Sequence, residues 1–178
     1  MKKVLFLIAF VTVSIISSSS FAQTANVNIT LSDVLSFSVT QPGSLDVNFN
    51  TEEKYNNGIT SLATDHISVI SSRGYVVKAI AGTVTGIAAL APGSVKLTPA
   101  IGATNGGNAA GITYGSSVTL PAAGGTAATV ITATNTSWNG AVSANKFNVS
   151  YLIGAGGTYA GKATGTNVIP VVYTVTQQ

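Results

Sequence analysis

Residues 23–39 read QTANVNITLSDVLSFSV, and this stretch decides the fold. Its apolar side chains fall on odd positions with small polar residues between them, except around Asp33: Val27, Ile29, Leu31, Leu35, Phe37 and Val39. A period of two is typical of a strand with one face on a core and the other in water. The end of the chain repeats the pattern at Ile169, Val171, Tyr173 and Val175. A mature chain that begins and ends on such strands is predicted to be an all-β sandwich or barrel.

Between these two ends the sequence favours short strands separated by turns. Thr, Val, Ala, Gly, Ser and Asn dominate and only 7% of the residues are charged, which is the composition of strands and turns rather than of helices. We expect short strands over residues 45–49, 67–70, 75–80, 95–98, 118–120, 130–134 and 147–153. Residues 71–74 should close a hairpin between two of these strands, and residues 51–58 should form a polar loop.

The first 22 residues have the pattern of a secretory signal peptide. Two lysines precede an apolar run over residues 4–16, and the small residues Ser20 and Ala22 fit a cleavage site before Gln23. The run is shorter than the roughly 20 residues that cross a bilayer. No later stretch of the sequence is long and apolar enough to do so. We therefore expect export with cleavage, and no membrane span afterwards.

Cleavage would leave residues 23–178 as a single domain with few charges. It removes Lys2 and Lys3, so that six Lys and Arg remain against five Asp and Glu. This near-neutral balance gives no electrostatic footprint for nucleic acid, so we expect no nucleic-acid partner. The chain has no cysteine, and the fold must hold through packing and sheet hydrogen bonds without disulfides.

No residue pattern in the chain indicates catalysis or a cofactor. His66 is the only histidine, and its neighbour Asp65 would point the other way on a strand. The carboxylates are scattered apart from Glu52–Glu53, whereas a glycosidase needs two of them held across a cleft, so a hydrolase would require folding to pair them. The glycines of residues 154–161 match neither the dinucleotide fingerprint nor the P-loop. We expect a non-enzymatic protein without a cofactor.

One alternative is a calcium site, because side chains with oxygen ligands recur at every second position: Asp46, Asn48, Asn50 and Glu52. An EF-hand loop also needs a glycine at its sixth position and a closing glutamate, where this chain has Thr51 and Asn57. If Leu45, Val47 and Phe49 face the core, the same polar residues are the solvated face of a strand. We expect no metal, with calcium as the alternative.

Three segments together resemble subunits of chaperone–usher fimbriae, especially the colonisation-factor-like pilins and the spore-coat-U-like secreted proteins. The first is the alternating ANVNITL of residues 25–31, directly behind the leader. The second is the AGGTYAG turn of residues 155–161, and the third is the final strand VVYTVT of residues 171–176. The chain departs from the family pattern in the inserted run of residues 162–168 and in the absence of a disulfide, which many but not all fimbrial subunits carry.

The resemblance implies an immunoglobulin-like β-sandwich of about 7–9 strands that lacks its last strand. The missing strand leaves a groove with unpaired backbone groups. A periplasmic chaperone fills the groove first, and the N-terminal extension of the next subunit then replaces it by strand addition. The product is a filament at the cell surface, reached through the periplasm, with neighbouring copies or related subunits as partners and a host or surface glycan as a ligand.

Carried over to this chain, the resemblance assigns residues 23–32 as the donor strand, with Val27, Ile29 and Leu31 as the plugging side chains. The closing strand would line the acceptor groove through Val171, Tyr173 and Val175.

A rival hypothesis is a self-contained secreted β-sandwich that binds a carbohydrate or protein ligand through its loops. Trp138 and Tyr159 are the candidate stacking residues for a sugar, and the loop at Glu52–Glu53 is a second candidate surface. In that case the N-terminal strand would fold back into its own sheet. The oligomeric state of the mature protein separates the two hypotheses.

Overall fold

β-Strands make up nearly all of the regular structure in the computed structural model, which describes residues 27–40, 45–140 and 144–178. The strands are β1 (Leu35–Val39), β2 (Ile59–Ser71), β3 (Tyr75–Ala81), β4 (Thr85–Gly86), β5 (Val95–Ile101), β6 (Ile112–Tyr114), β7 (Val118–Thr119), β8 (Ala128–Ala133), β9 (Ala144–Ile153), β10 (Asn167–Val168) and β11 (Val171–Gln177). The described residues also form a short α-helix, α2 (Glu52–Asn57), and a 3₁₀ turn, η1 (Pro92–Ser94). The expected all-β class is confirmed. The described strands number eleven rather than about 7–9 because four of them are only two or three residues long.

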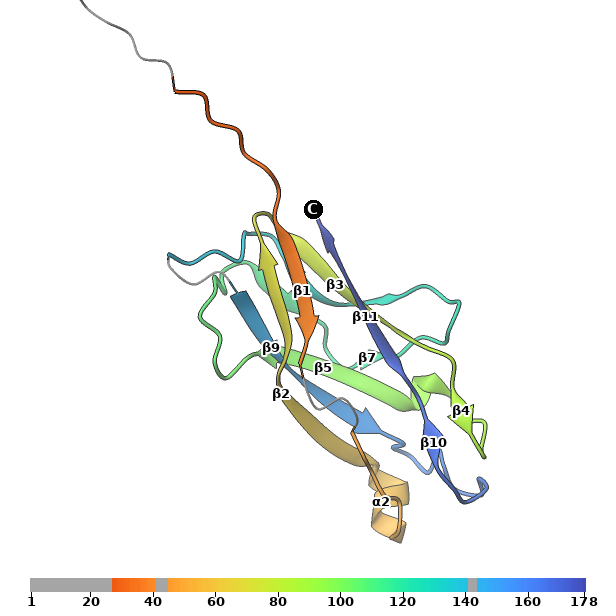
Figure 1. Ribbon diagram of the computed structural model, residues 1–178. Coiled ribbons are helices and arrows are strands. Elements are labelled where there is room, and N and C mark those ends of the chain that lie inside the picture. The colour runs from red at the N-terminus through yellow and green to blue at the C-terminus, as the bar shows by residue number, and fades with distance from the viewer. Residues whose placement is uncertain (1–26, 41–44, 141–143) are drawn as a thin grey trace, which may run out of the picture. The chain divides into compact units, whose positions relative to one another are not determined.

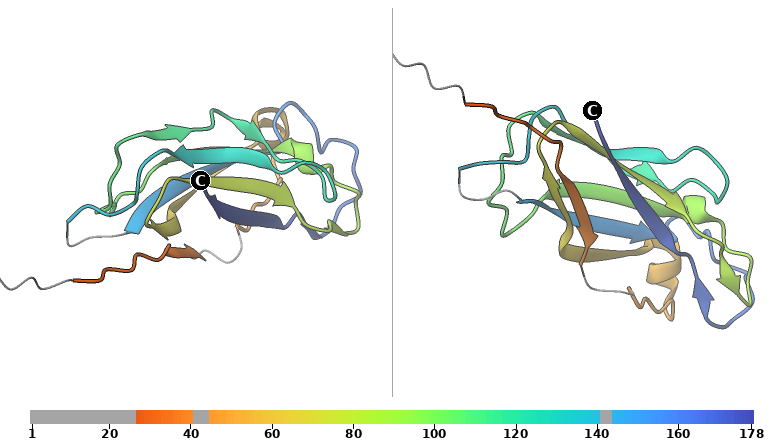
Figure 2. Two further views of the ribbon diagram at one scale, coloured as in Figure 1. Left: turned by 90° about the horizontal axis from the view of Figure 1, so that it is seen from above. Right: turned by 45° about the horizontal axis from the view of Figure 1, so that its top comes forward.

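Two antiparallel sheets hold the core between them. One has the order β1-β2-β9-β5-β7 and the other β11-β3-β8-β6, while β4 and β10 form a separate two-stranded ribbon. Inward side chains of both sheets meet in one apolar cluster, which includes Val69, Leu97 and Phe147 from the first sheet and Val77 and Ile131 from the second. This arrangement is consistent with a β-sandwich. Figures 1 and 2 show that the edge strands β1 and β11 lie on the same side of the fold.

Alternating sequence explains most of the long strands. In β9 every second residue is buried, from Asn145 to Tyr151, and in β3 the buried residues run from Tyr75 to Ala81 in the same rhythm. Such alternation fixes the register, because a slip by one residue would turn each buried side chain to water. The predicted strands at 95–98, 130–134 and 147–153 are confirmed within β5, β8 and β9, and the closing strand is β11.

The predicted hairpin across residues 71–74 is wrong. β2 pairs with β1 and β9, and β3 pairs with β11 and β8, so the chain crosses from one sheet to the other at this turn. The apolar faces of β2 and β3 meet across the core instead of lying side by side. Alternation shows that each segment has a buried face but does not tell which strand is its neighbour.

The opening stretch is strand only in its second half. Residues 35–39 pair with the end of β2, from Leu35 opposite Ser71 to Val39 opposite Ile67. Residues 27–34 belong to no strand, although they continue the same alternation. Residues 45–50 likewise carry the alternation without being in a strand, so the predicted strand at 45–49 is also wrong.

The polar loop expected at residues 51–58 contains the helix α2. The side chain of Thr51 caps its start by accepting a hydrogen bond from the Lys54 backbone, Glu52 and Glu53 lie in its first turn, and Gly58 ends it with a positive φ of 75°. A capping threonine, acidic residues in the first turn and a glycine after the last turn are each ordinary helix signals. They are visible in the sequence, but the segment is too short to show an apolar period.

Residues 32–178 form one compact unit, and residues up to Leu31 belong to another. The expected signal peptide of residues 1–22 and the first residues of the expected donor strand, 23–26, lie outside the described residues. Within the described residues, no helix has the length and apolar character needed to pass through a bilayer.

Candidate functional site

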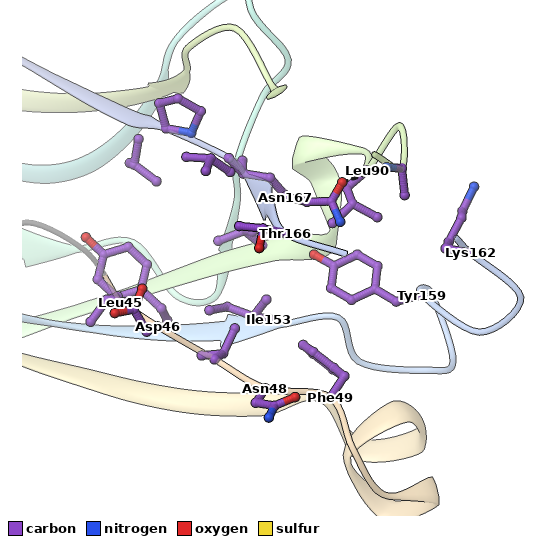
Figure 3. A pocket seen from close by; sticks show the side chains of 18 of the residues that line it. Leu45, Asp46, Asn48, Phe49, Leu90, Ile153, Tyr159, Lys162, Thr166 and Asn167 are labelled. Carbon is purple, nitrogen blue, oxygen red and sulfur yellow. Dashed lines mark hydrogen bonds between the residues drawn. The ribbon is translucent and has the colours of Figure 1, made fainter. Parts of the chain in front are cut away.

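A cleft of about 1050 Å³ opens between the two sheets on the side of β1 and β11. Its walls come from β1, the 45–49 segment, β2, β9 and the 162–173 segment. Figure 3 shows lining side chains of the 45–49 segment, Ile153 at the end of β9, and Tyr159 to Asn167. The lining is mixed, with apolar, aromatic and polar side chains that include Leu45, Phe49, His66, Val95, Tyr151, Ile153, Tyr159, Asn167, Ile169, Val171 and Tyr173. A cleft of this size accommodates a chain segment as readily as a small molecule.

Aromatic rings close one end of the cleft. Phe49 packs edge-on against Tyr159, with 5.1 Å between the ring centroids, and lies 5.5 Å from Tyr55 of α2. The Tyr159 hydroxyl is 2.6 Å from Ser94 Oγ, which anchors the 154–161 turn to η1. Gly154 permits this packing, because its φ is +69° and a Cβ there would lie 2.6 Å from the Tyr159 ring.

The residues of the calcium alternative do not form a shared cage. Lys54 Nζ donates hydrogen bonds to Asn50 Oδ1 at 2.7 Å and to the Asn48 carbonyl at 3.2 Å, so an ammonium group already occupies these oxygens. Asp46 lines the cleft, whereas Glu52 lies in the first turn of α2. Among the described residues no three His, Cys, Asp or Glu side chains come together as a metal site would require.

His66 lies in the wall of the cleft because of a β-bulge. The register of β2 against β9 shifts between Ala63 and Ile67, and Asp65 within the bulge has a positive φ of 48°. Four steps along β2, from Ala63 to Ile67, face only two along β9, from Val149 to Phe147, and with these two extra residues His66 and Ile67 are both buried although they are neighbours. Asp65 takes a different set of partners, since its carboxylate accepts hydrogen bonds from the backbone and hydroxyl of Thr104. As expected from the sequence, the two neighbours do not form an acid-base couple.

A chain of hydrogen bonds runs from His66 across the sandwich to β11. His66 Nδ1 is 2.8 Å from the carbonyl oxygen of Thr40, and His66 Nε2 is 2.8 Å from the hydroxyl of Tyr151 on β9. That hydroxyl is 2.7 Å from the hydroxyl of Tyr173 on β11. Burial lowers the pKa of His66, against the opposing effect of the Thr40 hydrogen bond, and raises the pKa of both tyrosines. All three groups are therefore neutral near pH 7. The sequence analysis did not single out Tyr151, since only the fold brings it to His66.

The closing strand forms one lip of the cleft and has a free edge. β11 pairs with β3 on one side, and in the described part of the chain no strand pairs with its other side. Val171 and Tyr173 line the cleft, whereas Val175 packs on the core beyond its lining. Past Val175 the opening is closed by Gln177, whose side-chain amide donates to the Val34 carbonyl at 2.7 Å. The three residues predicted for the groove thus share one face of the strand, but only two of them line the cleft.

The three predicted plugging side chains are exposed. Val27, Ile29 and Leu31 have 79%, 77% and 90% of their surface accessible, and none of them lies in a strand. Large aliphatic side chains at three alternate positions, all open to water, are an unusual concentration for a surface segment.

The two candidate stacking residues for a sugar lie beyond opposite ends of β9. Trp138 is in the β8–β9 connection and is 41% exposed, whereas Tyr159 follows β9 and is only 8% exposed. The ring of Tyr159 packs against Phe49, and its hydroxyl is hydrogen-bonded to Ser94. The fold does not bring Trp138 and Tyr159 into one site.

The ionisable groups of the cleft are few. Among the described lining residues, Asp46 is the one carboxylate, and His66 and Lys162 are the other ionisable side chains besides tyrosine. Asp33 forms an ion pair with Arg73 on the surface, with 2.8 Å between Asp33 Oδ1 and Arg73 Nε. The arrangement offers apolar walls and backbone hydrogen-bonding groups more than acid-base chemistry. Comparisons of the chain with protein-family models and with curated protein sequences found no match to either.

Proposed function

We propose that this chain is a non-enzymatic structural subunit of a bacterial surface filament, assembled by β-strand addition. The cleft beside β11 receives a strand from another copy or a related subunit, and the segment around Val27, Ile29 and Leu31 is the strand that each copy donates. The observation that carries the proposal is the free edge of β11 beside a cleft that extends to the core.

The order of strands supports an immunoglobulin-like sandwich without its last strand. Such sandwiches place strands A, B, E and D in one sheet and C, F and G in the other. In chain order β1, β2, β3, β5, β9 and β11 take the places of A to F, with A-B-E-D running β1-β2-β9-β5 and F beside C as β11 beside β3. The place of G, next to F, is the free edge of β11. Strands β6, β7 and β8 are additions between D and E.

A free strand edge of this kind exposes groups that would be paired or buried in a complete sandwich, and the same groups can bind another strand. Unpaired backbone N–H and C=O groups along β11 are a template for another strand, and the cleft beneath them would expose apolar core atoms to water. A strand added there would pair with the backbone of β11 and place every second side chain in the cleft. Specificity would come from those side chains, and much of the affinity from the backbone.

The donor segment has suitable side chains for this role. Fully burying one Val, Ile or Leu side chain contributes about 1.5–3 kcal/mol, so three contribute roughly 5–9 kcal/mol. Association costs about 4–15 kcal/mol of lost translational and rotational freedom, so side chains alone give weak binding. The hydrogen bonds to β11 are therefore needed for a stable joint. Because donor and acceptor are different surfaces of one chain, each addition leaves a new end open and the product is a filament.

The proposal includes export of the chain, a chaperone that covers the cleft in the periplasm, and a final location at the cell surface. A periplasmic chaperone would protect the free edge during transit, because an unfilled cleft is a template for pairing with other strands. The cleft carries apolar walls and a free strand edge, whereas Trp138 and Tyr159 do not share a site. These features favour the filament over the loop-based ligand-binding module.

Deletion of residues 23–32 tests the donor role. The truncated chain should remain as soluble monomers or as a chaperone complex, without polymers, when polymer formation is followed by size-exclusion chromatography and electron microscopy. A sharper comparison uses Ile29→Lys and Thr30→Lys, which add the same charge to adjacent positions on opposite faces of the strand. Ile29→Lys should abolish polymers and Thr30→Lys should retain them. Filaments formed by the truncated chain, or equal effects of the two lysines, would refute the proposal.

A further inference from the structure

We propose that His66 makes strand uptake depend on pH, so that the cleft takes up an apolar strand while the imidazole is neutral and loses affinity once it is protonated. This inference rests on the proposed function and adds regulation to the same cleft. Its basis is the position of His66, which lines the cleft, is only 5% exposed, and is hydrogen-bonded to Thr40 and Tyr151, the latter linking it to Tyr173 of the opposite sheet.

The Thr40 carbonyl fixes the direction of every proton in this chain of hydrogen bonds. A carbonyl oxygen only accepts, so His66 Nδ1 carries a hydrogen and donates it across 2.8 Å. In the neutral imidazole Nε2 then has the lone pair, and it accepts from the Tyr151 hydroxyl. With its hydrogen so used, the Tyr151 oxygen accepts from the Tyr173 hydroxyl. The neutral ring thus satisfies all of these polar groups at the base of the cleft.

Protonation of His66 reverses this order. Nε2 becomes a donor, so the Tyr151 hydroxyl must turn to donate to Tyr173, and the Tyr173 hydroxyl must find an acceptor elsewhere. In the open cleft water can supply that acceptor and can solvate part of the new charge. Under a bound strand with aliphatic side chains it cannot, because a buried charge without a partner is strongly disfavoured. The strand-bound form should therefore hold its proton less tightly than the open form.

The groups around His66 offer no compensation for a positive charge. Thr40 faces it from the end of β1, Tyr151 from β9 and Tyr173 from β11, with the two tyrosine rings 5.8 Å and 5.9 Å from the imidazole between centroids. The pKa of each tyrosine is raised mainly by burial, so both remain uncharged hydroxyls. In the described ranges no carboxylate hydrogen bonds to the imidazole or forms an ion pair with it.

Three charged side chains lie in the neighbourhood without reaching the ring. Asp46 and Lys162 also line the cleft, and the carboxylate of Asp65 is taken by Thr104. Burial already lowers the pKa of His66 in the open cleft. A strand that removes the remaining water from the ring should lower it further.

The single histidine makes the inference measurable. The full chain with Ile29→Lys serves as a receptor that cannot donate, and a synthetic peptide of residues 23–32 serves as the strand. The Cε1–H resonance of His66 is titrated by NMR with and without saturating peptide, and peptide affinity is measured at pH 7.5 and pH 5. We expect the peptide to lower the pKa of His66. Below both pKa values, each unit of that lowering weakens peptide binding about tenfold relative to pH 7.5.

His66→Gln is the matched variant, because a glutamine amide can donate to Thr40 and accept from Tyr151 but does not titrate. Its peptide affinity should be the same at both pH values. An unchanged His66 pKa with equal affinity at both pH values would overturn this inference and leave the proposed function standing. A failure of the peptide to bind at either pH would overturn the proposed function and this inference with it. If His66→Gln does not fold, the NMR titration of the Ile29→Lys chain decides alone.

Discussion

Replacing Tyr151 with phenylalanine removes the middle hydroxyl of the hydrogen-bonded chain that links the two sheets. His66 Nε2 then loses its donor and the Tyr173 hydroxyl loses its acceptor. A buried polar group left without a partner costs about 1–3 kcal/mol. Tyr173 is partly buried but lines the cleft, so its hydroxyl can recover a hydrogen bond from a water molecule there. We therefore expect Tyr151→Phe to lower the free energy of unfolding by about 2–4 kcal/mol.

Tyr173→Phe is the matched control, since it removes the hydroxyl at the end of the same chain. Tyr151 can still donate to His66, and only one hydrogen bond is lost, so the expected cost is about 0.5–1.5 kcal/mol. Both variants are measured by urea unfolding at pH 7.5 in the Ile29→Lys background, where the chain should be monomeric, with the slope of the transition checked for constancy. A cost of Tyr173→Phe equal to or above that of Tyr151→Phe would refute the assigned direction of the hydrogen bonds.

Two further predictions concern residues that are not members of this hydrogen-bonded chain. An alanine in a left-handed backbone conformation costs roughly 1–2 kcal/mol, and Gly154→Ala should destabilise the protein by more than this because its Cβ would also meet the Tyr159 ring. Gly156 has a similar φ of +70° but nothing within 4 Å of the position of a Cβ, so Gly156→Ala should cost only the roughly 1–2 kcal/mol of the backbone conformation. Urea unfolding measures both variants. Hydrogen bonding to Thr104 lowers the pKa of Asp65, so Asp65 stabilises the fold above its unfolded pKa of about 3.9 and this contribution is lost as the pH falls through the lower folded value. Asp65→Asn should therefore unfold with a lower free energy than the unaltered protein at pH 7, and this difference should shrink from about pH 4 downward. A difference in unfolding free energy that grew on acidification would contradict the prediction.

Sequence reasoning succeeds here where the pattern is local. Alternation in β3, β9 and β11 is enough to identify each as a strand with one buried face. It fails where the result depends on which segments meet. Residues 45–49 alternate as regularly as β11 does, yet they form a wall of the cleft and not a strand.

The site itself depends on contacts between distant residues. His66 faces the cleft because of a bulge opposite β9, in which Asp65 has a positive φ. Nothing in the sequence around Asp65 announces this bulge. Tyr151 and Tyr173 are ordinary inward positions of their strands until the two sheets are packed together. The exposed residues Val27, Ile29 and Leu31 are assigned from their alternation together with the resemblance to fimbrial subunits, and their role as a donated strand stays a prediction.

Crosslinking between copies tests the central claim most directly, because the chain has no cysteine of its own. A chain carrying Ile29→Cys is mixed under oxidising conditions with chains carrying a cysteine at Ile169 or Val171, which line the cleft, or at Val172 or Thr174, which are exposed positions outside its lining. A disulfide requires Cα atoms within about 4.4–6.8 Å, so it reports close seating of the strand. We predict disulfide-linked pairs with the cleft positions and none with Val172→Cys or Thr174→Cys. Equal crosslinking at all four positions, or none at any, would contradict the uptake of one copy's strand by the cleft of another.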